Sequence, residues 1–127
     1  MATSGTDGLI KFWDLRSAKQ PTLVCRGGHS HWASNVQYNP FHDQLVLSTG
    51  TDTLANLWRI SSISSAPLLD SDPTANADKR VKTFEHSDAC YTSAWGAADA
   101  WIYLTVGYEG KVVLHHVPSK EKYKILL

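Results

Sequence analysis

Apolar and polar residues alternate with a period of two along most of the chain. In residues 10–13, Ile10 and Phe12 fall on one side, while Lys11 and Trp13 fall on the other. Alternation of this kind is typical of a β-strand with one buried face. The pattern predicts strands at residues 8–14, 22–26, 33–39, 44–49, 54–59, 81–85, 90–95, 101–106, 111–117 and 122–127. No stretch has a convincing helical period, so the sequence predicts an all-β fold.

Three windows of the chain repeat one another. They cover residues 3–14, 48–59 and 105–116. In two units a histidine, His29 or His86, precedes an acidic residue by 23 positions. Residues 29–59 and 86–116 therefore align without a gap. Internal repeats of this length indicate stacked supersecondary units that share a continuous core.

The second and third windows are separated by more residues than the first and second. The additional residues lie between Arg59 and His86, in a stretch rich in Ser, Asp and Pro. Such clusters are typical of solvated loops. We therefore expect a loop insertion at residues 61–80.

The composition contributes mainly by exclusion. Lys plus Arg and Asp plus Glu each number 12, and a net charge of zero argues against nucleic-acid binding and against a polybasic membrane-surface binder. The 127 residues are 43% hydrophobic and 19% charged, as in globular proteins. We find no apolar run of roughly 18 residues and no signal-peptide pattern. Cys25 and Cys90 form no CxxC motif, so we expect a reduced, cytosolic compartment and apolar packing roles for both.

The repeats resemble those of the WD-repeat β-propeller family, in which Gly-His stands early and Trp-Asp late in a repeat of about 40–45 residues. Here Gly28-His29 and Trp13-Asp14 carry this resemblance. The pairs that depart from it are Glu85-His86, Trp58-Arg59 and His115-His116. The resemblance implies a partial WD40 β-propeller of about two and a half four-stranded antiparallel blades.

The same resemblance implies where each blade begins and ends. Residues 1–28 form a partial blade of strand c and an outer strand, 29–85 form a second blade with the insertion 61–80, and 86–127 form a C-terminal blade. Each blade needs neighbours to cover its faces. We therefore expect open apolar faces and self-association through them.

A closer resemblance is to the WD-repeat proteins that interact with the endosome-associated recycling and Golgi-associated retrograde tethering complexes. It rests on residues 29–32, 35–39, 42–45, 61–65, 98–101, 108–110 and 122–127. It runs over essentially the whole chain and corresponds to the C-terminal third of the family protein. It implies a seven-bladed adaptor in the cytoplasm, peripheral to endosomes and the trans-Golgi network. The implied partners are tethering-complex subunits, with no nucleic acid and no direct membrane insertion.

The WD-repeat resemblance also implies a buried structural tetrad. Its members in the second unit are His29, Ser48, Asp52 and Trp58. In such a set the indole N–H, hydroxyl, imidazole and carboxylate form one hydrogen-bonded chain. Partial tetrads are expected at Thr3, Asp7 and Trp13, whose histidine would precede Met1, and at His86, Thr105 and Glu109. His115 replaces the last tryptophan, so we expect a weaker network there.

Serine, histidine and aspartate in one set also suggest a hydrolase triad. No nucleophile elbow, oxyanion loop or phosphate-binding glycine loop accompanies them. Among metal candidates, His115 and His116 are adjacent strand residues that point to opposite faces, and His29 is assigned to the tetrad. We therefore expect no catalytic residue, no metal and no cofactor.

Three further residues are candidate partner contacts. Arg16 is the last residue of the motif Trp13-Asp14-Leu15-Arg16. This motif resembles the Trp-Asp-x-Arg box of substrate receptors in cullin–RING ubiquitin ligases. The alternative is that Arg16 is a solvated arginine after strand c. Trp32 and Tyr108 are candidate aromatic anchors, although Trp32 and Trp101 can equally pack between blades.

The leading hypothesis is a non-enzymatic interaction scaffold: part of a WD-repeat adaptor that binds vesicle-tethering complexes in endosomal recycling and retrograde transport. The alternatives are a ubiquitin-ligase substrate receptor and a non-functional truncated propeller. An enzyme is the least favoured reading, because a fold by itself supplies no reaction.

Overall fold

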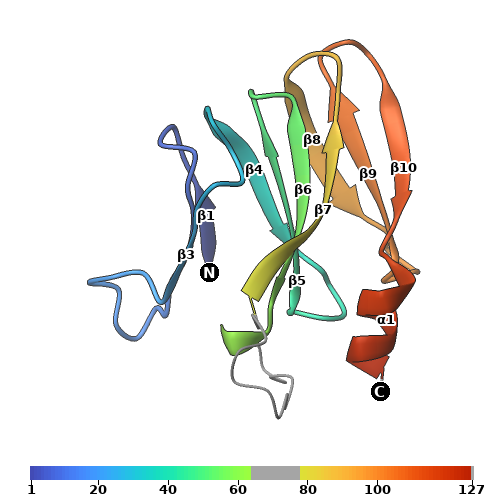
Figure 1. Cartoon of the computed structure of the whole chain (residues 1–127). Coiled ribbons are helices and arrows are strands. Elements are labelled where there is room, and N and C mark those ends of the chain that lie inside the picture. The colour runs from blue at the N-terminus through green and yellow to red at the C-terminus, as the bar shows by residue number, and fades with distance from the viewer. Residues whose placement is uncertain (64–77, 127) are drawn as a thin grey trace.

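The computed structural model describes residues 1–63 and 78–126, which form three antiparallel sheets. The first sheet has the order β1-β2-β3, the middle sheet β4-β5-β6-β7 and the third sheet β8-β9-β10. The strands are β1 (Ala2–Ser4), β2 (Ile10–Phe12), β3 (Leu23–Cys25), β4 (Ala33–Tyr38), β5 (Leu45–Gly50), β6 (Leu54–Ile60), β7 (Asp78–Glu85), β8 (Cys90–Trp95), β9 (Ile102–Gly107) and β10 (Val112–His116). A short 3₁₀ helix, η1 (Ser61–Ile63), follows β6, and α1 (Ser119–Leu126) ends the described chain (Figure 1).

The middle sheet is covered on both faces, as expected for an internal propeller blade. On one face Val46, Trp58 and Ile60 pack against Ile10 and Phe12 of the first sheet. The opposite face packs against the third sheet through Leu45, Leu47, Leu57, Tyr103 and Val117. Every residue of β5 is buried. Full burial of one such aliphatic side chain contributes about 1.5–3 kcal/mol, so both layers stabilise the fold.

The outer face of the third sheet remains open in the described chain. Val112 and Leu114 of β10 are exposed, and so is Leu104, the partner of Leu114 on β9. The two cysteines are buried free thiols, and burial is the main cause that raises the pKa of each to about 11.

A bulge in β7 directs its basic side chains toward two different sheets. Arg80 pairs with Trp58 and Lys82 with the adjacent Leu57, which leaves Val81 as the additional residue. Paired residues share a face of the sheet, so the bulge sends Arg80 and Lys82 to opposite faces. Arg80 Nη1 donates to the Gly27 carbonyl at 3.4 Å, whereas Lys82 Nζ donates to the His116 carbonyl at 3.3 Å.

The prediction of a strand at residues 122–127 is wrong, because this segment lies in helix α1. The helix begins after Pro118, whose carbonyl accepts from the Glu121 and Lys122 amides at 3.0 and 3.1 Å. Glu121 is buried and Ile125 packs on the core. These two residues are four apart, so they share one face of a helix. The third sheet accordingly has three described strands, not the four expected.

Two further expectations need correction. Strand β1 was not expected, and it pairs Ala2–Ser4 with Ile10–Phe12. The insertion was expected to span residues 61–80, yet η1 occupies its start and β7 already begins at Asp78. The rest of the expected insertion, 64–77, lies outside the described residues. Within the described ranges, no helix is both long and apolar enough to cross a bilayer.

Candidate interaction surface

The middle sheet brings the four predicted tetrad residues together. Trp58 Nε1 donates to Ser48 Oγ at 2.8 Å, and Ser48 Oγ lies 2.8 Å from His29 Nε2. His29 Nδ1 lies 3.1 Å from Asp52 Oδ1. Because the imidazole Nδ1–H donates to the carboxylate, Nε2 accepts from the Ser48 hydroxyl, whose oxygen in turn accepts from the indole. Each of these buried polar groups therefore has a partner.

The third sheet repeats the chain with a different last member. His86 Nδ1 lies 2.5 Å from Glu109 Oε1, and His86 Nε2 lies 2.7 Å from Thr105 Oγ1. Thr105 Oγ1 lies 2.8 Å from His115 Nε2. His86 likewise donates from Nδ1 to Glu109, so Thr105 donates to His86 Nε2 and accepts from His115. A histidine thus supplies the N–H that tryptophan supplies in the middle sheet.

His115 is held in an aromatic environment that favours its neutral form. Its ring stacks on Tyr103 at 4.8 Å and meets the edge of Phe84 at 4.7 Å. Burial is the largest of the causes that lower the His115 pKa from 6.5 to about 4, followed by the positive charge of Lys82. At neutral pH the imidazole is uncharged and can act as the donor that this network requires.

Two glycines leave the space that the middle network occupies. A Cβ at Gly28 would lie 2.2 Å from the Trp58 ring, and a Cβ at Gly50 would lie 2.6 Å from both His29 Nδ1 and Asp52 Oδ1. Any side chain at either position would therefore displace the network. This packing role of the two glycines was not predicted from the sequence.

The first sheet brings together part of its predicted set. Trp13 Nε1 donates to Thr3 Oγ1 at 2.9 Å. Asp7 lies apart from this pair: its carboxylate accepts from the Leu9 amide at 3.0 Å and lies 3.5 Å from Lys11 Nζ. Asp7 thus organises its own turn.

The networks fix turns that present aromatic side chains. Asp52 Oδ2 accepts from the Ser30 amide at 2.8 Å, and the Trp32 carbonyl accepts from the Thr51 amide at 2.9 Å. Next to Glu109, the Tyr108 amide donates to the Ala89 carbonyl at 2.9 Å. The positions just before β4 and within the β9–β10 turn are therefore tied to the buried histidines.

These turns and the start of β8 form an aromatic edge, which we define as Trp32, Tyr91 and Tyr108. The three side chains are 52%, 57% and 63% exposed. The Tyr91 and Tyr108 rings meet edge to face at 5.5 Å. Ser34, two residues after Trp32, donates to the Tyr91 carbonyl at 3.2 Å, so the start of β4 lies beside β8. The start of β4, the start of β8 and the β9–β10 turn lie at the upper end of the molecule in Figure 1.

Of the two tryptophans that could pack between blades, only Trp101 does so. Its ring stacks at 4.8 Å on His42, which belongs to the β4–β5 loop of the middle sheet. Trp32 instead stacks at 5.4 Å on its neighbour His31 and stays half exposed. Tyr91 was not among the predicted contacts.

Arg16 is engaged within its own turn. Its Nε and Nη2 atoms lie 3.0 and 2.8 Å from the two oxygens of Asp14, and its side chain is 90% exposed. This bidentate contact is the main cause that lowers the Asp14 pKa to about 2.

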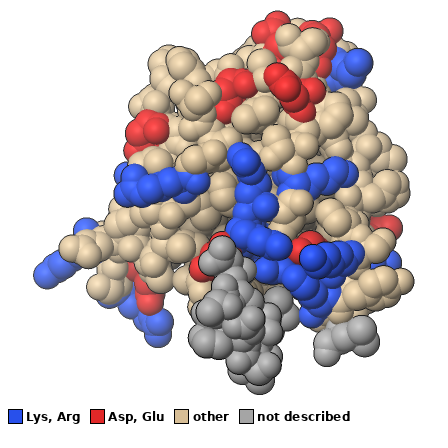
Figure 2. All heavy atoms as spheres, viewed as in Figure 1, with Lys and Arg blue, Asp and Glu red and all other residues tan. Residues whose placement is uncertain are grey.

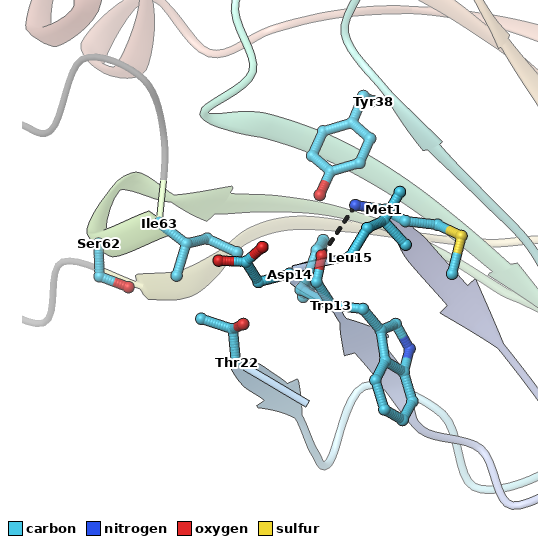
Figure 3. Close-up of a pocket in the computed structure, with 9 residues that line it drawn as sticks. Met1, Trp13, Asp14, Leu15, Thr22, Tyr38, Ser62 and Ile63 are labelled. Carbon is cyan, nitrogen blue, oxygen red and sulfur yellow. Dashed lines mark hydrogen bonds between the residues drawn. The ribbon is translucent and has the colours of Figure 1, made fainter. Parts of the chain in front are cut away.

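Beside this turn an open pocket of about 560 Å³ lies between the first sheet and η1. Figure 3 shows the Asp14 carboxylate and the Tyr38 hydroxyl directed into this space, and the Met1 amino group donating to the Trp13 carbonyl at 3.1 Å. Among the described residues that line it, Asp14 is the one carboxylate.

The buried networks have no nucleophilic role in this geometry. Ser48 is fully buried and bonded on both sides by Trp58 and His29.

His115 is buried while His116, the next residue on β10, is exposed. Within the described residues, no three His, Cys, Asp or Glu side chains are placed to hold a metal ion.

Comparisons with known proteins agree with this architecture. Residues 1–58 match the family described as the EIPR1 beta-propeller. EARP and GARP complex-interacting protein 1 from Homo sapiens is 37% identical over 145 aligned positions, which cover 100% of this chain and 37% of the relative. EARP-interacting protein 1 from Caenorhabditis elegans is 32% identical, over 99% of this chain and 38% of the relative.

A plant relative also matches, over a smaller part of the chain. WD repeat-containing protein DWA2 from Arabidopsis thaliana is 35% identical over 71% of this chain and 27% of its own length. The chain thus spans well under half the length of the relatives that it matches. Together with the three antiparallel sheets, these matches show that the chain is part of a WD-repeat β-propeller and resembles, along its whole length, the proteins that interact with EARP and GARP.

Proposed function

We propose that this chain is a non-enzymatic interaction scaffold, part of a WD-repeat adaptor that binds the EARP and GARP tethering complexes. The observation that carries the proposal is the match of the whole chain to relatives named for interaction with those complexes. The structure supports a scaffold role because Ser48, the serine of the triad-like set, is buried and bonded within the network.

The aromatic edge is the surface that we assign to this binding. Aromatic side chains bury large areas at low cost in conformational entropy, and they dominate interface hot spots. Trp32 and Tyr108 project from turns that the histidine networks hold in place, so little further ordering is needed on binding.

The cellular role that follows is recruitment of tethers in endosomal recycling and retrograde transport. The protein would then act in the cytoplasm, at the surface of endosomes and the trans-Golgi network. This part of the proposal rests on the resemblance, and the absence of a membrane-spanning helix in the described chain is compatible with it.

The proposal is tested by tagging the 127-residue chain and quantifying co-purifying proteins by mass spectrometry. We expect EARP and GARP subunits, with recovery reduced at least about tenfold by Trp32→Ala combined with Tyr108→Ala. Phe41→Ala is the matched control, because Phe41 is an equally exposed aromatic in the β4–β5 loop, away from the aromatic edge.

Arg16→Ala separates the ubiquitin-ligase alternative. This variant should leave tether recovery unchanged, because Arg16 is engaged with Asp14. Recovery of a ligase adaptor that disappears with Arg16→Ala, without tether subunits, would overturn the proposal. Recovery of chaperones alone would also contradict it for this chain.

A further inference from the structure

The zero net charge of the chain conceals a strong separation of charge. Figure 2 shows Lys and Arg gathered over β7 and α1, and Asp and Glu gathered at the upper end of the molecule. We define the basic edge by the six cationic residues of these two elements. They are Lys79, Arg80, Lys82, Lys120, Lys122 and Lys124.

The fold holds the two parts of the basic edge together rigidly. Lys79 pairs with Arg59 across β6 and β7, on the side of the middle sheet that faces α1. Arg59 Nη1 donates to Glu121 Oε2 at 2.7 Å, and both side chains are buried. This ion pair ties the helix to β6, the strand next to β7 in the middle sheet. The Lys122 ammonium group lies over the Trp101 ring, 5.5 Å from its centroid, and this contact positions the side chain.

The acidic groups on these elements do not neutralise the basic edge. Glu121 is committed to Arg59, and the Asp78 carboxylate accepts from the Ser62 amide and hydroxyl. Glu85 stands at the far end of β7, opposite Leu54. Burial and the charges of Arg59, Lys79 and Lys120 lower the pKa of Lys124, as expected where cations repel one another.

The basic edge also includes the free side of a strand. β7 is the outermost strand of the middle sheet in the described chain. An edge strand offers backbone donors and acceptors to a further strand. Lys and Arg on that edge oppose pairing with a second copy of the same edge, because like charges would lie side by side. An acidic strand would instead place opposite charges side by side.

We propose that the basic edge binds an extended, acidic segment of a protein partner, which adds as a strand along β7 while its carboxylates meet the lysines of β7 and α1. This second binding surface is separate from the aromatic edge, and the inference does not depend on tether binding. A flat anionic membrane also attracts lysines, but it would make no use of the open strand edge.

The experiment measures fluorescence anisotropy of a labelled peptide in which Glu and Val alternate, with the full 127-residue chain. We expect binding that weakens with added salt and falls at least about tenfold when Lys79→Glu and Lys124→Glu are combined. Lys19→Glu with Lys111→Glu is the matched control, since both residues are exposed, lie outside the basic edge and produce the same change in charge.

Two probes separate strand addition from simple charge attraction. A peptide with Gln in place of Glu, and a Glu peptide N-methylated at alternate residues, should each bind at least about tenfold more weakly. Equal binding of the N-methylated peptide would overturn strand addition, and equal loss in the control variant would overturn the assignment to the basic edge. Binding to phosphatidylserine vesicles without peptide binding, or salt-sensitive self-association of the chain, would overturn the proposed partner.

Discussion

The middle and third sheets solve one packing problem with different chemistry. Each joins a carboxylate, an imidazole and a hydroxyl in the same order, and each closes the chain with an N–H donor 2.8 Å from the hydroxyl oxygen. That donor is the indole of Trp58 in the middle sheet and the imidazole of His115 in the third. The position therefore accepts a flat ring with an N–H and is not specific for tryptophan.

The exchange has a consequence for stability. An indole N–H cannot move and does not titrate, whereas an imidazole can change tautomer or bind a proton. The last donor of the middle network is therefore fixed by its covalent structure, whereas the last donor of the third network depends on pH. Substitutions and changes of pH test this difference between the two sheets.

Removal of the central hydroxyl should lower the free energy of unfolding more than any other change considered. Ser48→Ala leaves the Trp58 N–H and His29 Nε2 buried without their partner, which should lower the free energy of unfolding by about 3 kcal/mol. Thr105→Val removes the corresponding hydroxyl at nearly constant volume and should cost less, about 2 kcal/mol, because His115 can change tautomer. Urea unfolding of each variant measures both values. An equal or reversed order would contradict the contrast.

A second expected effect concerns pH. The His115 pKa is about 4 in the folded chain and 6.5 ordinarily, so the unfolded chain binds more protons between these values. The stabilising contribution is complete above pH 6.5, is lost as the pH falls toward 4, and amounts to at most about 3 kcal/mol. Hydrogen exchange should show β10 losing protection before β6.

His115→Gln tests this assignment, because the amide can donate but does not titrate. The difference in unfolding free energy between this variant and the parent should shrink as the pH falls. His116→Gln, at the exposed neighbouring position, is the control and should leave the pH profile unchanged. A parent and a His115→Gln variant with parallel profiles would show that other groups control the acid response.

The smallest expected effect is a gain in stability. Gly8, Thr53 and Gly110 follow the acidic residue of each repeat, and all three have positive φ, at 75°, 75° and 83°. A β-branched residue is strained in this conformation, so Thr53→Gly should raise the free energy of unfolding by about 1 kcal/mol. The middle sheet would then match its neighbours, and thermal unfolding measures the change. No increase in the melting temperature would mean that other contacts of Thr53 offset the strain.

The repeat spacing made much of the buried site predictable. Equal separations matched His29 with Asp52 and His86 with Glu109, and the WD-repeat resemblance implied that each set is buried and hydrogen-bonded. The sequence could not distinguish α1 from a strand, because Lys122, Tyr123, Lys124 and Ile125 alternate, while the same residues also place Ile125 one helical turn after Glu121.

Other features depend on geometry that composition averages away. The exposure of Tyr91 follows an irregularity between Cys90 and Thr92, which turns the strand at that point. The basic edge depends on the bulge at Val81 and on the position of a helix that was not expected. Neither the exposure of Tyr91 nor the basic edge can be inferred from composition and a net charge of zero.

The buried pair of Arg59 and Glu121 links residues 62 positions apart. Repeat proteins commonly open one unit at a time from an end, since each unit contacts only its neighbours. Here the terminal helix cannot detach without breaking a charge pair whose other half belongs to the middle sheet. Fraying from the carboxyl end is therefore coupled to the centre of the molecule, and the last two sheets should unfold as a single cooperative unit.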